Sequence, residues 1–199
     1  HKLTTLRAEN HISYSGEGEK LASSIAMIVI LVSFSMLFAS LFLAYFYYRI
    51  TEPVWPPMGM ENLNLFYPSI STGIIVLSSM TLFGFDLAFK KGNQIHMKAW
   101  LAVTILLGAS FLGSQMYLWE GLKNIGLYAS SGIFPSIVYS FTWIHVAHIV
   151  AAILSLFWLI PISSKTSMTF KEENVVLNVS KFWHFLSIIW LIIYFSIFV

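Results

Sequence analysis

The sequence predicts an all-α membrane protein, a bundle of five transmembrane helices. Of its 199 residues, 57% are apolar and only 10% are charged, whereas an ordinary soluble domain has about 25% charged residues. Charges, Pro and Gly divide the chain into five apolar stretches, each close to the ~20 residues that a bilayer core requires. The chain has no cysteine and a formal net charge of only +2. These values exclude disulfides and thiolate metal sites and give no indication of a nucleic-acid partner.

The first two helices are bounded by charged and turn-forming residues. The first is expected over residues 21–48, after a cytoplasmic tail over residues 1–19. Its uncharged stretch is too long for the ~7–15-residue apolar region of a signal peptide. The second is expected over residues 68–89 and begins at Pro68, which suits the first turn of a helix. With the three helices that follow, they form one transmembrane domain over residues 20–199.

The last three helices are delimited in the same way. The third is expected over residues 99–119, an interval between two charged residues. The fourth, over residues 134–160, follows a glycine-containing turn and ends because Pro161 cannot continue a helix. The fifth covers residues 179–198. No internal repeat or second domain is indicated.

The Lys and Arg residues predict the orientation, because positive charges are retained on the cytoplasmic side. The five successive segments outside the helices contain three, one, three, one and three of them. In order, they are Lys2, Arg7 and Lys20; Arg49; Lys90, Lys91 and Lys98; Lys123; Lys165, Lys171 and Lys181. This alternation places the N-terminus in the cytoplasm and the C-terminus outside.

Three histidines in the predicted helices, His145, His148 and His184, are the candidate haem or metal ligands. A bis-histidine haem needs two imidazoles from different helices at one depth. With these helix boundaries, His148 lies about 18 Å and His184 about 8 Å from the cytoplasmic end. The difference favours structural, hydrogen-bonded histidines. We expect their partners to be neighbours such as Thr142, Ser155 or Gln115.

The sequence disfavours two other classes of function. A haem-b, quinone-linked membrane electron carrier is disfavoured by the unequal depths of the histidines. A small transporter is disfavoured because there is no inverted repeat and no charge at the midplane. None of the nine Asp and Glu residues lies in the middle third of a predicted span, so a proton pump through this chain alone is not expected.

Five motifs in order resemble subunit III of the haem–copper terminal oxidases, which comprise cytochrome c and quinol oxidases. Residues 41–46, LFLAYF, and 55–59, WPPMG, are similar to the family's AYF…WPPxG signature. Residues 68–81 and residues 100–119 are similar to the family's next two helices. Residues 142–148 stand where the family has TGxHxxH, and residues 182–191 resemble its YWHF…VWL helix. The resemblance covers about residues 20–198. The motif residues, expected to be structural, are Trp55, Pro56, Pro57, Gly59, Gln115, Thr142, His145, His148, Trp183, His184 and Trp190.

The resemblance implies a five-helix, non-catalytic subunit of a complex that reduces oxygen to water and pumps protons. It implies no catalytic residue, haem or metal in this chain; haem and copper belong to partner subunits. The implied partners are subunit I in direct contact, subunit II, other respiratory subunits, and phospholipid held near the oxygen entry route. A bacterial inner membrane is favoured over the mitochondrial one. Whether the electron donor is cytochrome c or quinol is left open.

Two positions depart from the family's pattern. Phe34 stands where the family usually has a Glu, and Ser187 stands where an Asp often follows the WHF motif. Both changes remove a carboxylate that would lie in the membrane. We therefore expect roles in packing and lipid retention rather than in proton storage.

Overall fold

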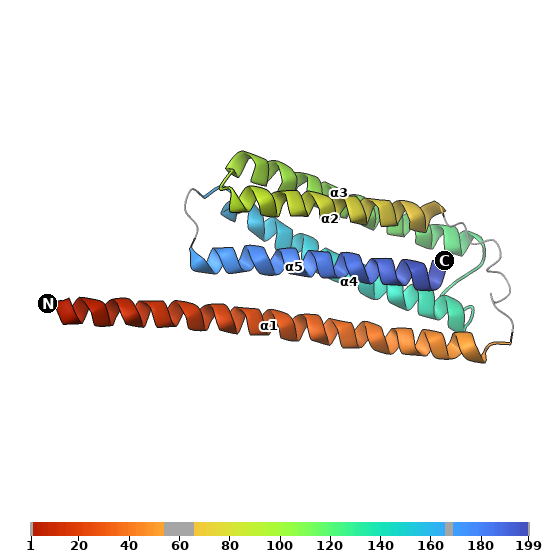
Figure 1. Cartoon of the computed structure of the whole chain (residues 1–199). Helices are drawn as coiled ribbons and strands as arrows, with labels where there is room; N and C mark the ends of the chain where they lie inside the picture. The colour runs from red at the N-terminus through yellow and green to blue at the C-terminus, as the bar shows by residue number, and fades with distance from the viewer. Residues whose placement is uncertain (1, 54–65, 166–168, 199) are drawn as a thin grey trace.

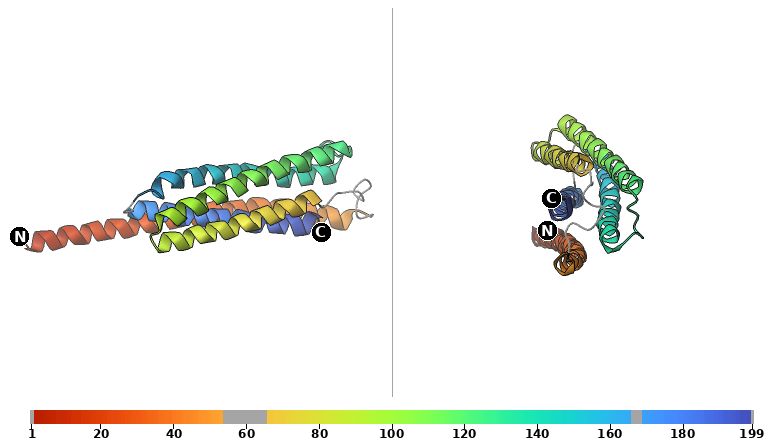
Figure 2. Two further views of the ribbon diagram at one scale, coloured as in Figure 1. Left: turned by 90° about the horizontal axis from the view of Figure 1, so that it is seen from above. Right: turned by 90° about the vertical axis from the view of Figure 1, so that its right-hand side faces the viewer.

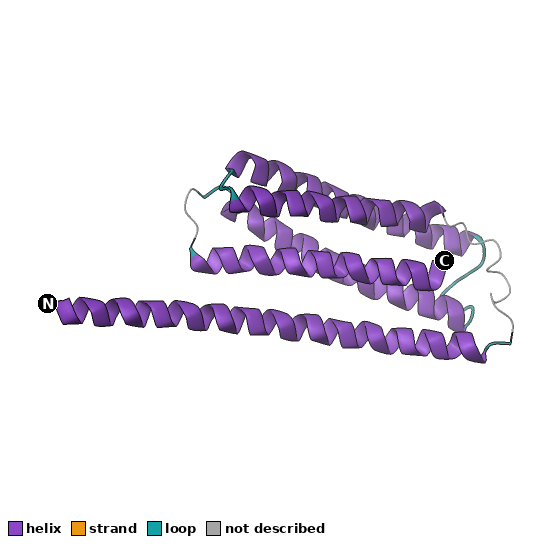
Figure 3. Cartoon of the chain, viewed as in Figure 1, coloured by secondary structure: helices purple, strands orange, loops and turns teal. Residues whose placement is uncertain are grey.

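The computed structural model describes residues 2–53, 66–165 and 169–198, and in the first helix it describes side chains from residue 21. Within these ranges the chain is helical and contains no strand (Figure 3). The five α-helices are α1 (Lys2–Thr51), α2 (Phe66–Lys90), α3 (Gln94–Asn124), α4 (Ile133–Ile162) and α5 (Phe170–Ile193), and a π-helix (Tyr194–Phe198) continues α5.

All five helices are long and apolar enough to cross a membrane, which confirms the predicted fold class. The candidate spans are Leu21–Thr51, Phe66–Lys90, Gln94–Asn124, Ile133–Ile162 and Lys171–Phe198. Successive helices run in opposite directions, so the two termini lie at opposite ends of the bundle (Figure 1).

Several helices extend beyond the boundaries expected from the sequence. α5 begins at Phe170 rather than near residue 179, because the polar segment before the apolar stretch caps the helix. The backbone N–H of Thr169 donates to Glu172 Oε2 at 2.9 Å, which satisfies a donor at the start of the helix. α4 includes Pro161 in its last turn and ends at Ile162. α1 is helical from Lys2, through the region expected to be a tail.

α5 lies between α1 and α2 in two perpendicular views (Figures 1 and 2). α2 and α3 form a hairpin, and Gly92, with φ of 66°, provides the left-handed turn between them. α3 and α5 both pack against α4. This arrangement gives α5 contacts on both sides, and it places its side chains at the centre of the bundle.

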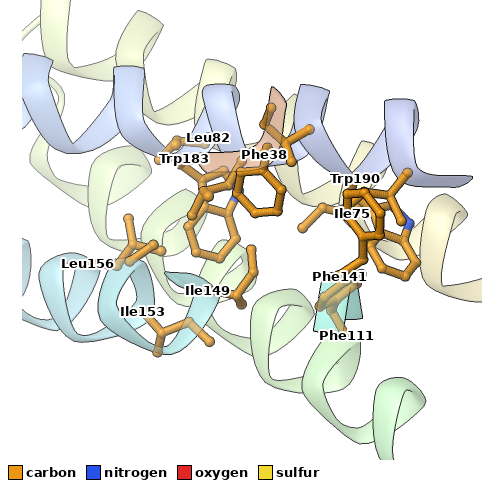
Figure 4. Packing of buried hydrophobic residues seen from close by; sticks show 14 of the residues in the cluster. Phe38, Ile75, Leu82, Phe111, Phe141, Ile149, Ile153, Leu156, Trp183 and Trp190 are labelled. Atoms are coloured by element: carbon orange, nitrogen blue, oxygen red, sulfur yellow. The ribbon is translucent and has the colours of Figure 1, made fainter. Parts of the chain in front are cut away.

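The core is built around the two tryptophans of α5, Trp183 and Trp190, which are fully buried (Figure 4). At Gly108 of α3, an added Cβ would lie 2.7 Å from Trp183 and 3.3 Å from Ile153. The glycine therefore lets α3 approach the indole ring and α4 closely, as small residues do between membrane helices.

α1 is the most exposed helix. Only 11% of its most apolar window is buried, against 50% for α5. It packs on α5 and α4, and its buried contacts include Phe38 and Tyr45. The Tyr45 hydroxyl donates to the carbonyl of Ser196 at 2.5 Å, which joins the end of α1 to the π-helix. Most of the apolar surface of α1 is free to contact lipid or another subunit.

Candidate functional site

Two clusters of side chains, each with a histidine, lie on different sides of α5. We call the first the aromatic seam; it is formed by Phe34 of α1, His148 of α4 and Phe182 of α5. We call the second the polar seam; it is formed by Ser79 and Asp86 of α2 with Ser180 and His184 of α5. Phe182 and His184 are two residues apart, so their side chains leave α5 about 200° apart.

In the aromatic seam, His148 is held by rings and by its own helix. The Phe34 ring lies edge-on to the imidazole, with centroids 4.2 Å apart and planes at 73°. Phe34 also lies 5.7 Å from the ring of Phe182. His148 Nδ1 is 2.6 Å from the carbonyl oxygen of Ile144, one turn earlier in α4. The imidazole can thus donate to a backbone carbonyl of its own helix.

In the polar seam, two hydrogen bonds and one longer charged contact connect α2 with α5. The Ser180 hydroxyl donates to Asp86 Oδ2 at 2.6 Å. His184 Nε2 is 3.9 Å from the same oxygen, an ion-pair distance that is too long for a direct hydrogen bond. His184 Nδ1 lies 2.6 Å from the Ser79 hydroxyl. The other oxygen of Asp86, Oδ1, is buried and has no hydrogen-bond partner among the described residues.

The third candidate, His145, lies in an aromatic box and not in either seam. It is fully buried, with ring centroids 5.8 Å from Phe111 and 5.4 Å from Trp190. Neither of its ring nitrogens has a hydrogen-bond partner among the described residues, and the same holds for the buried amide of Gln115.

The expected hydrogen bonds from the histidines to Thr142, Ser155 and Gln115 are therefore wrong. Thr142 Oγ1 accepts from Trp119 Nε1 at 3.0 Å and donates to the carbonyl of Val138 at 2.9 Å. The Ser155 hydroxyl donates to the carbonyl of Ala151 at 2.9 Å. In a helix, these short side chains bond their own backbone one turn back, which leaves them unavailable to a histidine on the same stripe.

The depth difference expected between His148 and His184 is also wrong. Each lies 14 residues from the same-side end of its helix, at Ile162 and Phe170, which corresponds to about 21 Å along each axis. The two side chains differ in the side of the bundle that they face. His148 lies in the aromatic seam, and His184 lies in the polar seam.

The remaining motif residues divide into two groups. Trp55, Pro56, Pro57 and Gly59 lie outside the described residues. Trp183 and Trp190 form the core, and Trp190 Nε1 donates to Thr72 Oγ1 of α2 at 3.0 Å. In the described part of the chain, no group of three or more His, Asp or Glu side chains is placed to hold a metal ion.

Two grooves on the described surface of the bundle have polar side chains in their lining. One, of about 420 Å³, lies between α2 and α5; Ser79, His184 and Ser187 line it together with apolar side chains such as Phe83. The other, of about 380 Å³, lies between α1 and α4, and its lining includes Ala44 and Ser140. The first groove exposes one end of the polar seam.

The polar seam is not predicted by the sequence analysis, which assigns no function to Asp86 or Ser79. Their spacing of seven residues, and the spacing of four between Ser180 and His184, place each pair on one helix face. These spacings were the available signal, but only the structure shows that the two faces meet.

Comparison with known proteins gives consistent matches along the chain. The family model described as cytochrome c oxidase subunit III matches residues 11–199. Cytochrome c oxidase subunit 3 of Thermostichus vulcanus is 31% identical over 171 residues, which cover 85% of this chain and 83% of the relative. The subunit 3 of Corynebacterium diphtheriae is 32% identical over 178 residues, which cover 88% and 86% of the two chains. That of Synechocystis sp. is 30% identical over 173 residues, which cover 84% and 71%.

Proposed function

The chain belongs to the cytochrome c oxidase subunit III family, and we propose that within its oxidase it stabilises subunit I and holds phospholipid near the oxygen entry route. Membership makes it a multi-pass membrane subunit of a terminal oxidase, in complex with other oxidase subunits. We further propose direct contact with subunit I, with subunit II and other respiratory subunits nearby. Haem and copper then reside in those partners, and this chain has no redox centre of its own.

The observation that carries the lipid proposal is the α1–α4 groove. It measures about 380 Å³ and is lined by Leu41, Ala44, Ile137 and Ser140 among others. Its apolar walls suit an acyl chain. α1 forms one wall while leaving most of its own surface exposed, including Leu43 at 73%. That surface suits a second, protein neighbour such as subunit I.

The proposed orientation follows the positive charges. Residues 1–19 and the loops after α2 and α4 lie in the cytoplasm, and the C-terminus lies outside. Residues 20–199 form the membrane domain, in the inner membrane of a bacterium. The motif histidines, tryptophans, Gln115 and Thr142 act in packing.

A groove-filling substitution tests the lipid proposal. Ala44→Phe places a ring in the α1–α4 groove, whereas Leu43→Phe, at the adjacent exposed position, is the matched control. We expect the purified A44F oxidase to lose bound phospholipid in native mass spectrometry and to inactivate faster during turnover. The L43F oxidase should behave as wild type. Equal lipid retention in both variants, with equal turnover lifetimes, would overturn the proposal.

A further inference from the structure

We propose that Gln115 of α3 and His145 of α4 form an internal water site, in which one buried water molecule bridges the amide and the imidazole. The site lies at the aromatic box of His145. It is separate from the lipid proposal, because neither residue lines the α1–α4 groove or the α2–α5 groove. The water joins α3 to α4 in the interior of the bundle.

The first step is the hydrogen-bonding capacity of the two side chains. Both residues are fully buried, with 0% exposure. Neither ring nitrogen of His145 and neither polar atom of the Gln115 amide has a hydrogen-bond partner among the described residues. A neutral imidazole has one donor and one acceptor, and an amide has two donors and a carbonyl oxygen. Because buried polar groups are bonded to protein or to ordered water, these two side chains require a partner that both donates and accepts.

The second step is the position of Gln115 beside His145. Residues 111, 115 and 119 recur at intervals of four and share one face of α3. The outer two of these residues contact α4: the Phe111 ring centroid lies 5.8 Å from that of His145, and Trp119 Nε1 donates to Thr142 Oγ1 at 3.0 Å. Gln115 lies between these contacts, one helical turn from each. It therefore faces the segment of α4 that carries His145.

The depths of the two residues agree with this placement. α3 ends at Asn124 and α4 begins at Ile133, on the same side of the bundle. Gln115 is nine residues from Asn124, or about 14 Å along the axis, and His145 is twelve residues from Ile133, or about 18 Å. The long side chain of Gln115 can span the difference of about 4 Å.

The neighbouring side chains leave the two residues without a protein partner. The Thr142 hydroxyl, one turn from His145, accepts from Trp119 and donates to the carbonyl of Val138. The Phe111 ring plane lies at 78° to the imidazole, and a contact between an N–H group and an aromatic ring is a weak hydrogen bond. Such a contact would also leave the acceptor nitrogen of His145 and the whole amide of Gln115 unbonded.

The chemistry of the site selects water and not an ion. α3 has no charged side chain between Lys98 and Glu120, and α4 has none over residues 133–162, so an ion beside Gln115 and His145 would have no countercharge on these helices. Water is neutral, and a buried water typically makes about three hydrogen bonds to polar groups that lack other partners. A single molecule can accept from the amide N–H or the imidazole N–H and donate to the Gln115 oxygen or the second ring nitrogen.

The other unpartnered polar atoms of the bundle do not form such a pair. The buried Oδ1 of Asp86 belongs to a side chain that is 22% exposed, so water can approach the carboxylate from outside. Trp183 Nε1 is a single donor without an acceptor role. Gln115 and His145 differ because both are fully buried and both contain donors and acceptors.

A density map of the purified wild-type oxidase, at a resolution that shows ordered water, tests the site without any variant. We expect one peak at about 2.7–3.2 Å from a ring nitrogen of His145 and from the Gln115 amide. Gln115→Met, which keeps the length of the side chain, should lose the peak. Ser155→Ala on α4 is the matched control and should keep it, because this hydroxyl donates to the carbonyl of Ala151 in its own helix.

Thermal release of the subunit from the oxidase measures whether the two residues share a partner. Q115M and His145→Phe should each lower the release temperature, because each leaves the water and the other side chain incompletely bonded. The double variant should lower it by less than the sum of the two single shifts, since an apolar pair requires no water.

Three results would overturn the proposal. A wild-type map with ordered water elsewhere in this chain but no peak at this position would show that the polar atoms rely on the surrounding rings. A direct hydrogen bond between Gln115 and His145 in that map would leave nothing for a water to bridge. Release shifts of Q115M and H145F that add up in the double variant would show that the two residues have no common partner.

Discussion

The two seams of α5 keep an imidazole inside the membrane by different means. His148 in the aromatic seam relies on ring edges and the carbonyl of Ile144. His184 in the polar seam relies on a carboxylate and a hydroxyl from another helix. Polar groups in lipid must find partners within the protein, and a carbonyl from the same helix suffices for a neutral imidazole. The polar seam therefore contains a carboxylate, Asp86, whereas the three residues of the aromatic seam include none.

The contrast between the two seams bears on Phe34 and Ser187, the two positions where the family usually has a carboxylate. Phe34 removes a carboxyl group from α1, and the structure places its ring against His148. Ser187, the other departure, donates to the carbonyl of Trp183 at 3.0 Å. Asp86 of α2, one turn from the loop end of that helix, meets α5 at His184. The carboxylate that packs on α5 therefore comes from α2 and not from the position of Phe34.

The largest effect is expected from removing the core that supports both seams. Trp183→Ala should destabilise the bundle by about 3–5 kcal/mol, as for large aromatic truncations in other cores, because Trp183 is fully buried between α3, α4 and α5. Thermal release of the subunit from the purified oxidase measures this loss. A release temperature equal to that of wild type would show that the indole does not hold the seams together.

The second largest effect is expected when a carboxylate is introduced into the aromatic seam. Phe34→Glu should cost about 3 kcal/mol when ionised at this depth, whereas Phe34→Gln, the uncharged control, should cost less. The carboxyl should pair with His148, whose ring centroid lies 4.2 Å from that of Phe34. Adding His148→Leu should therefore harm the Glu variant more than the Gln variant in assembly yield. Equal losses would mean that no charge pair forms.

A smaller effect is expected at the contact between α3 and α5. Gly108→Ala brings a methyl group within 2.7 Å of Trp183, and overpacking of this kind costs about 1–3 kcal/mol. Gly113→Ala, on the same helix with nothing within 4 Å of its added Cβ, is the matched control. Combining G108A with Trp183→Phe should recover part of the loss. Identical thermal release of G108A and G113A would rule out the close approach.

The smallest effect is expected where α1 meets the π-helix. Tyr45→Phe removes the hydroxyl that donates to Ser196 O at 2.5 Å, and a hydrogen bond of this kind contributes about 0.5–1.5 kcal/mol. Hydrogen exchange of the amides in residues 194–198 should accelerate, while exchange in α2 stays unchanged. Equally faster hydrogen exchange in both segments would indicate that the whole bundle is destabilised, and not only the contact between Tyr45 and Ser196.

The sequence was sufficient for the fold class and the order of the helices, because lipid imposes a length and an apolar composition on every span. It was insufficient for the start of α5, since the capping residues Thr169 and Glu172 are polar and read as a loop. The error displaced His184 by nine residues of helix and produced the false depth difference. Contacts across helices, such as Ser180 with Asp86, depend on how two helices rotate against each other. The rotation of one helix relative to another cannot be predicted from a single sequence.

We propose that this chain is an oxidase subunit without a redox centre of its own. Affinity purification through a tag on this chain, followed by its separation from the complex, tests it most directly. The account predicts that subunits I and II co-purify in fixed ratio with haem and copper, and that the separated chain has no haem absorption in the visible range. A separated chain that retains stoichiometric haem, or a tagged chain that purifies without oxidase subunits, would contradict the account.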